Sequence, residues 1–70
     1  MTTDPATAEP PKHPLHALAT FELTAYRRRL EKAIAYSDRQ DPVPPFRADL
    51  QSALNAVLAE QDSRQKLAEA

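Results

Sequence analysis

The chain has 70 residues, a formal net charge of −1, no Gly and no Cys. A chain this short buries little apolar surface by itself, and without Cys it has no disulfide or thiolate metal site to stabilise it. The balanced charge gives no reason to expect a polyanion or a membrane surface as a partner. These properties predict one small domain that gains stability by associating with another chain.

The first 13 residues contain Pro5, Pro10 and Pro11 among Thr, Ala, Asp and Glu, with almost nothing to bury. This composition is typical of chain segments without a packed core, so we predict a disordered Pro-rich tail over residues 1–13. No apolar run approaches the roughly 20 residues that cross a bilayer, and the tail lacks a basic region followed by an apolar one. We therefore expect a cytoplasmic protein with no membrane partner.

The segment between Pro14 and Pro42 contains neither Pro nor Gly. Pro at the first position of a helix costs no hydrogen bond, so we predict a helix over residues 14–40. At 100° per residue the apolar side chains of this segment fall on one stripe, as in an amphipathic helix. The stripe comprises Leu15, Ala19, Leu23, Tyr26, Leu30, Ala33 and Ile34, and Ser37 continues its spacing.

Pro42 must end this helix, because the residue before a Pro is pushed out of the helical conformation and Pro has no N–H to donate. We predict a Pro-rich turn over residues 41–44 and a second helix over residues 45–67. A connector this short favours antiparallel neighbours. Gln61 is the one polar residue on the apolar stripe of the second helix, and it either bonds across the helix interface or marks where the stripe reaches solvent. The apolar members of this stripe are Phe46, Leu50, Ala53, Leu54, Val57 and Leu58.

The expected fold is therefore all-α, an antiparallel two-helix hairpin over residues 14–70. In a hairpin alone the two stripes are only half covered, which is little compensation for the conformational entropy lost on folding. We predict that two copies pair into a four-helix bundle. The residues predicted for self-association are Leu23, Tyr26, Leu30, Ile34, Phe46, Leu50, Leu54, Val57 and Leu58.

A second surface lies on the other side of the first helix. It carries apolar residues outside the main stripe, although single exposed aromatic residues are common on surfaces. The densest charge cluster, Arg27–Arg29, is the other candidate for partner binding and could neutralise phosphates. Successive helical residues diverge, however, and the simpler interpretation is that Glu31 pairs with Arg27 or Arg28. The residues of this predicted partner surface are Leu18, Phe21, Tyr36, Arg27, Arg28 and Arg29.

The sequence contains no pattern that indicates catalysis. His13 and His16 have a spacing compatible with metal binding on a helix, but no Cys supplements them. The absence of Gly removes phosphate-binding loops, and Glu60 and Asp62 diverge on a helix rather than forming an acid/base pair. We predict a protein that is not an enzyme, with no catalytic residue, no cofactor and no metal site.

The function that follows is a small non-enzymatic helical protein–protein interaction or regulatory subunit that self-associates, first as a homodimer. Two alternatives stay open. One is a nucleic-acid-associated dimeric regulator that uses the Arg27–Arg29 cluster, although nucleic acid is the less favoured partner because the chain is slightly acidic. The other is an accessory subunit packed on a larger protein, such as an enzyme complex.

Overall fold

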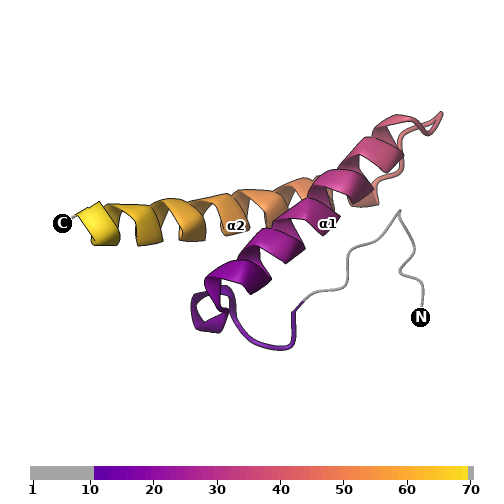
Figure 1. The fold of residues 1–70 in the computed structure, drawn as a ribbon. Coiled ribbons are helices and arrows are strands. Elements are labelled where there is room, and N and C mark those ends of the chain that lie inside the picture. Colours follow the sequence, from indigo (N-terminus) through magenta and orange to yellow (C-terminus); the bar gives the residue numbers. More distant parts are fainter. Residues whose placement is uncertain (1–10, 70) are drawn as a thin grey trace.

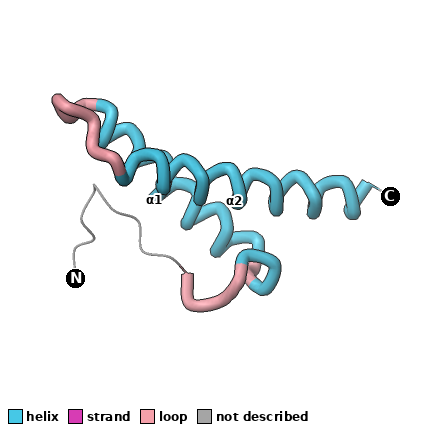
Figure 2. Tube along the Cα trace, turned by 180° about the vertical axis from the view of Figure 1, so that it is seen from behind, coloured by secondary structure: helices cyan, strands magenta, loops and turns pink. Residues whose placement is uncertain are grey.

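The computed structural model describes residues 11–69, which form two long helices and one short helical turn (Figures 1 and 2). The elements are the 3-10 helix η1 (Leu15–Ala17), α1 (Thr20–Asp38) and α2 (Phe46–Glu69), and this part of the chain contains no strand. Both views show α1 and α2 running antiparallel and crossing at an angle, so that the C-terminal turns of α2 extend past the start of α1. The predicted helical hairpin is confirmed, whereas its pairing into a four-helix bundle stays a prediction.

The first long helix begins later than the predicted residue 14. The chain forms η1 and then becomes extended at Leu18 and Ala19, and α1 starts at Thr20. The carboxylate of Glu22 accepts a hydrogen bond of 2.9 Å from the backbone N–H of Ala19, which is the residue preceding the helix. A Glu at the third helical position caps a helix N-terminus in this way and also complements the helix dipole. The local capping chemistry therefore interrupts the helix that the apolar stripe predicted. Of the predicted tail over residues 1–13, all but residues 11–13 lie outside the described residues.

Leu18 is buried in the core, whereas the prediction placed it on the outer side of the first helix as part of the partner surface. It is 6% exposed and belongs to the same apolar cluster as Leu23, which is 1% exposed. The two residues occupy the positions of a hydrophobic staple, one just before the capping residue Ala19 and the other in the fourth helical position. Because the chain is extended at Leu18, the side chain enters the core instead of following the outer side of α1.

The connector between the helices covers residues 39–45, a little more than the predicted turn over 41–44. The N–H groups of Arg39 and Gln40 donate to the carbonyls of Tyr36 and Ser37, which closes the last turn of α1. At the other end α2 starts at Phe46, directly after two Pro residues, as the rule for Pro at helix starts predicts. The Pro-rich segment thus joins two helices that must turn back on each other.

An ion pair spans this connector. Asp38, the last residue of α1, accepts hydrogen bonds from two nitrogens of Arg47, which lies in the first turn of α2. The hydrogen bond to Asp38, together with the attraction of its carboxylate, raises the pKa of Arg47 above its ordinary value. Both side chains are partly exposed, so the pair fixes the geometry of the turn more than it stabilises the fold.

The core lies between α1 and α2 and is formed by most of the two predicted stripes together with Leu18, whereas Ala19 of the first stripe is exposed. Ser37 is also fully buried there, and its hydroxyl donates to the carbonyl of Ala33 at 2.9 Å. Leu15, Phe46, Ala53 and Leu54 pack against the edge of the core, and Leu58 remains 37% exposed. The central residues predicted for self-association thus already contact each other within one hairpin. The buried apolar residues are Leu18, Leu23, Tyr26, Leu30, Ala33, Ile34, Leu50 and Val57.

Candidate interaction surfaces

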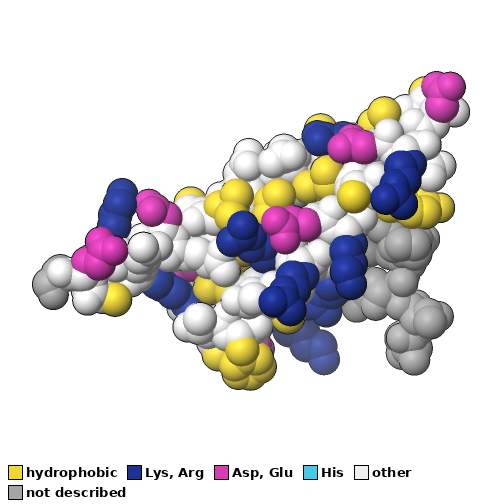
Figure 3. Space-filling view, turned by 45° about the horizontal axis from the view of Figure 1, so that its top comes forward, with side chains coloured by type: hydrophobic (Ala, Val, Ile, Leu, Met, Phe, Trp, Pro, Cys, Tyr) yellow, Lys and Arg dark blue, Asp and Glu magenta, His cyan; other side chains and the backbone are white. Residues whose placement is uncertain are grey.

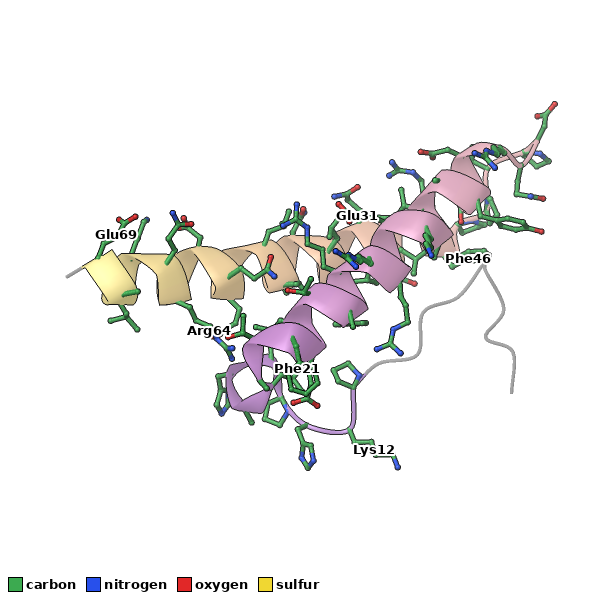
Figure 4. All side chains as sticks on the ribbon, viewed as in Figure 1. Lys12, Phe21, Glu31, Phe46, Arg64 and Glu69 are labelled. Atoms are coloured by element: carbon green, nitrogen blue, oxygen red, sulfur yellow. The ribbon has the colours of Figure 1, made fainter. Side chains whose placement is uncertain are left out.

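Arg64 connects α2 to the segment before α1 (Figure 4). Its Nη2 donates to the carbonyl of Leu18 at 2.7 Å, and the carbonyls of Leu15 and His16 lie at 3.2 and 3.4 Å. Its Nε bonds Glu60 at 2.9 Å, which orients the guanidinium. The Leu15 carbonyl also accepts the N–H of Leu18 within η1, whereas η1 ends too soon to supply helical N–H donors to the carbonyls of His16 and Leu18. Arg64 therefore holds η1 against α2, a role that the sequence analysis missed.

Gln61 bonds across the helix interface, as one of its two sequence interpretations held. Its Oε1 accepts a hydrogen bond of 3.2 Å from Nη1 of Arg27. Arg27 also forms an ion pair of 3.5 Å with Glu31, which confirms the expected pairing at helical spacing. Arg27 is thus engaged with α2 and with its own helix, and it is no longer a free member of the Arg27–Arg29 cluster.

The nine cationic side chains divide into two groups. Four of them pair with carboxylates: Arg27 with Glu31, Arg47 with Asp38, Arg64 with Glu60, and Lys66 with Asp62. Within residues 11–69 the remaining cations have no ion-pair partner, and except for Lys12 they belong to α1 or its C-terminal cap. These are Lys12, Arg28, Arg29, Lys32 and Arg39.

The outer side of α1 carries three cations of this second group, Arg28, Lys32 and the capping residue Arg39. Six exposed residues follow one another there at alternating intervals of four and three, which places them on one stripe of the helix. We call this stripe the basic face, and Figure 3 shows Lys and Arg side chains gathered along α1. Its members are Phe21, Ala25, Arg28, Lys32, Ala35 and Arg39.

No carboxylate of α1 forms an ion pair with a cation of the basic face. Glu22 is bonded to the helix start, Glu31 to Arg27, and Asp38 to Arg47. All three acids lie close to the Arg27–Arg29 cluster in the sequence. In the structure each acid bonds a partner that is not a member of the basic face. Two of those partners, Arg27 and Arg47, also connect α1 to α2.

Aromatic side chains accompany the cations. Phe21 is 76% exposed and Tyr36 is 38% exposed, in agreement with their predicted place on the outer side of α1. The guanidinium of Arg29 lies 5.9 Å from the ring centre of Tyr26, within the range of a cation–π interaction. The surface thus combines positive charge with apolar area, which is typical of a protein-binding face.

An open pocket of about 380 Å³ lies beside the N-terminal end of the basic face, between α1 and residues 11–13. Leu18, Phe21, Ala25 and Tyr26 supply its apolar lining, and its charged lining comes from Lys12, Arg29 and Glu22. His13 also lines it, but no group of three His, Asp or Glu side chains in the described residues is arranged to hold a metal ion. The pocket suits an apolar side chain with a negative charge nearby.

A second stripe, the α2 edge, lies along the side of the core on α2. Its residues alternate at intervals of three and four, and none of them carries a formal charge: Gln51, Leu54, Leu58, Gln61 and Gln65. Leu54 is partly buried against the core, and Leu58 is the more exposed of the two leucines. Figure 3 shows apolar side chains along the line where the helices meet. The α2 edge therefore has an apolar centre, formed by the two leucines, and glutamine side chains on either side of it.

Comparison with known proteins gives no match to a protein family, a curated protein or a solved structure. Neither α1 nor α2, the long helices of residues 11–69, combines the length and the apolar character that crossing a bilayer requires. The surfaces described above are thus the basis for inferring function.

Proposed function

We propose that this chain is a small non-enzymatic helical interaction subunit that self-associates through the α2 edge. The observation that carries the proposal is the uncharged stripe centred on Leu54 and Leu58. An uncharged, heptad-spaced stripe at the side of a helix pair is the surface on which a further helix packs. Adding a second hairpin there gives a four-helix bundle.

The order of residues along the α2 edge suits a twofold-symmetric pair. If two copies of α2 lie antiparallel, Leu54 of each copy meets Leu58 of the other, and Gln51 meets Gln61. Self-complementarity of this kind is what an interface between identical subunits requires. Gln51 and Gln61, which already bond Asn55 and Arg27 within the chain, then border an apolar centre with uncharged polar groups. With only two leucines contributed by each copy, we expect a weak dimer that dissociates on dilution.

Leu58→Glu is expected to abolish this dimer without unfolding the hairpin. Leu58 is 37% exposed, so Glu is tolerated in the monomer, whereas in the dimer two carboxylates would be buried near apolar side chains. We expect the dissociation constant to rise at least about tenfold. Light scattering over a concentration series measures the molar mass, and far-UV circular dichroism checks the helix content.

The matched control is Leu67→Glu, which makes the same chemical change on the same helix at a side chain that is 74% exposed and outside the α2 edge. This variant should dimerise like the unmodified chain. An unmodified chain that stays monomeric at all concentrations, or a Leu58→Glu variant that dimerises normally, would contradict the proposal.

The two alternatives differ in how well they fit these surfaces. The nucleic-acid-associated regulator was expected to use Arg27, Arg28 and Arg29 together, and the engagement of Arg27 with Glu31 and Gln61 weighs against that use. An accessory subunit on a larger protein fits the same exposed stripes as the interaction subunit and differs only in the identity of the partner.

A further inference from the structure

We propose that the basic face of α1 binds an acidic amphipathic helix of a different protein. The proposal rests on the interaction role inferred above and assigns the chemistry of the partner. Three observations carry it: the unpaired cations, the heptad-like spacing of the face, and the pocket at its N-terminal end.

The unpaired cations set the charge of the partner. Arg28, Lys32 and Arg39 are exposed, lie on one stripe, and have no ion pair within residues 11–69. By contrast, Arg27 and the three cations of α2 are all paired. A surface whose charges are left unmatched in this way is complementary to a row of carboxylates.

The spacing of the face sets the shape of the partner. Ala25 and Ala35 stand on either side of the pair Arg28 and Lys32 along the stripe, so a second helix can approach α1 closely at these two positions. From Phe21 to Arg39 the stripe measures about 27 Å at 1.5 Å per residue, which is the length of a helix of about 18 residues. Carboxylates at intervals of three and four on that helix would meet the three cations of the stripe.

The pocket supplies an anchor for the partner helix. Phe21 is 76% exposed and borders the pocket together with Ala25 and Tyr26. A leucine or an aromatic side chain inserted there would cover Phe21, and the cations Lys12 and Arg29 line the pocket together with one carboxylate, Glu22, which is already bonded to the backbone N–H of Ala19. Buried aromatic anchors surrounded by polar groups supply most of the affinity in protein interfaces.

A second copy of this chain does not fit the face. The carboxylates Glu60 and Asp62 of α2 are already paired with Arg64 and Lys66 of the same helix. Of the other two carboxylates of α2, Asp49 lies in the first turn and Glu69 is the last residue, so they form no row. The partner is therefore a different protein, and the basic face is separate from the α2 edge.

Nucleic acid fits the face less well than an acidic helix does. Phosphates would satisfy the cations, but they would leave Phe21, the alanines and the apolar pocket lining without a partner. The chain as a whole has a net charge of −1, which opposes long-range attraction to a polyanion. An acidic helix needs only local complementarity along one side of α1.

The test uses the full chain and a labelled helical peptide of about 20 residues, with Glu placed to meet the three cations and Leu placed to meet Phe21 and the alanines. Fluorescence anisotropy measures binding of this peptide, of the same peptide with Gln in place of Glu, of a DNA duplex, and of vesicles containing phosphatidylserine. We expect the Glu peptide to bind most tightly and its binding to weaken as salt is added.

Arg28→Gln/Lys32→Gln is expected to weaken peptide binding about tenfold, since it removes two cations from the basic face. The matched controls are single variants: Lys32→Gln removes one charge from the basic face and should weaken binding, whereas Lys66→Gln removes one charge from the exposed part of α2 and should bind as the unmodified chain does. Circular dichroism verifies that all three variants keep their helices. Equal loss of binding in the two single variants would overturn the proposal, because it would show that only net charge matters.

Three further outcomes would also overturn it: no binding of the Glu peptide, equal binding of the Gln peptide, or tighter binding of DNA or vesicles. The peptide should bind the Leu58→Glu variant as well, because the basic face lies outside the α2 edge. Peptide binding by a monomeric chain would thus support this inference even if the proposed dimer were absent, so the two proposals fail separately.

Discussion

Replacing Leu30 with Asp is expected to unfold the hairpin. Leu30 is 1% exposed and lies in the middle of α1 within the apolar cluster. Removing a buried leucine costs about 2 to 5 kcal/mol, and an unpaired carboxylate at the same place adds several kcal/mol more. Small domains have about 5 kcal/mol of stability or little more, so the loss exceeds what this fold can tolerate. Far-UV circular dichroism should show loss of most of the helical signal.

The control is Leu67→Asp, which makes the same substitution at a side chain that is 74% exposed. That variant should keep its helical signal and its urea midpoint. Leu30→Ala gives a graded version of the experiment, with an expected decrease in the free energy of unfolding of about 2 to 4 kcal/mol. A Leu30→Asp chain that retains a cooperative unfolding transition would show that Leu30 does not lie in the core.

The hairpin itself could be predicted because its signals are local and repeated. The stripe through Leu23, Tyr26 and Leu30 has the helical period, and the Pro residues at 42, 44 and 45 leave only a short connector. Periodicity and Pro are the strongest indicators of helix position in a single sequence. Both depend on neighbours in the chain, and neither requires knowledge of how the helices pack.

The start of α1 was harder to predict because two local signals compete. Pro14 favours a helix start, and the stripe extends back to Leu15. Against these, Glu22 caps the helix at Ala19, and Leu18 and Leu23 have the spacing of a hydrophobic staple. Arg64 also stabilises the helix start at Thr20 by donating a hydrogen bond to the carbonyl of Leu18. Arg64 lies near the C-terminal end of α2, far from Leu18 in the sequence.

The interaction surfaces depend on contacts between distant residues, which the sequence does not specify. Arg27, Arg28 and Arg29 look equivalent in the sequence, and the hydrogen bond from Arg27 to Gln61 is what separates it from the other two. Asp38 likewise appears to be a neighbour of the cluster until its ion pair with Arg47 is known. The exposure of Phe21 and Tyr36 was predictable, since it follows from their angle to the apolar stripe.

Replacing Arg64 with Ala is expected to release η1 from α2. The side chain of Arg64 is 28% exposed and contacts three backbone carbonyls, the shortest contact being 2.7 Å to Leu18. One NH₂ group carries only two hydrogens, so the three carbonyls share them, and the hydrogen bond to Leu18 dominates. Hydrogen bonds from charged donors contribute about 1.5 to 3 kcal/mol, and we expect the free energy of unfolding to fall by about 1 to 2 kcal/mol.

Hydrogen exchange provides the sharper readout for Arg64. The N–H groups of Ala17 and Leu18 donate to the carbonyls of Pro14 and Leu15 at 2.9 and 3.1 Å, so both should exchange faster once η1 is released. Exchange in the middle of α1 and α2 should change only as much as global stability does.

The control for Arg64→Ala is Lys66→Ala. Lys66 pairs with Asp62 four residues earlier at 3.1 Å, just as Arg64 pairs with Glu60, but its side chain is 75% exposed. Both variants therefore lose one ion pair within α2, and only Arg64→Ala also loses the contacts to η1. Arg64→Lys should rescue little, because an ammonium cannot bond Glu60 and the carbonyl of Leu18 with the planar geometry of a guanidinium. Equal exchange at residues 17 and 18 in the Arg64→Ala and Lys66→Ala variants would mean that the capping of Ala19 and the burial of Leu18 hold the interrupted helix start without Arg64.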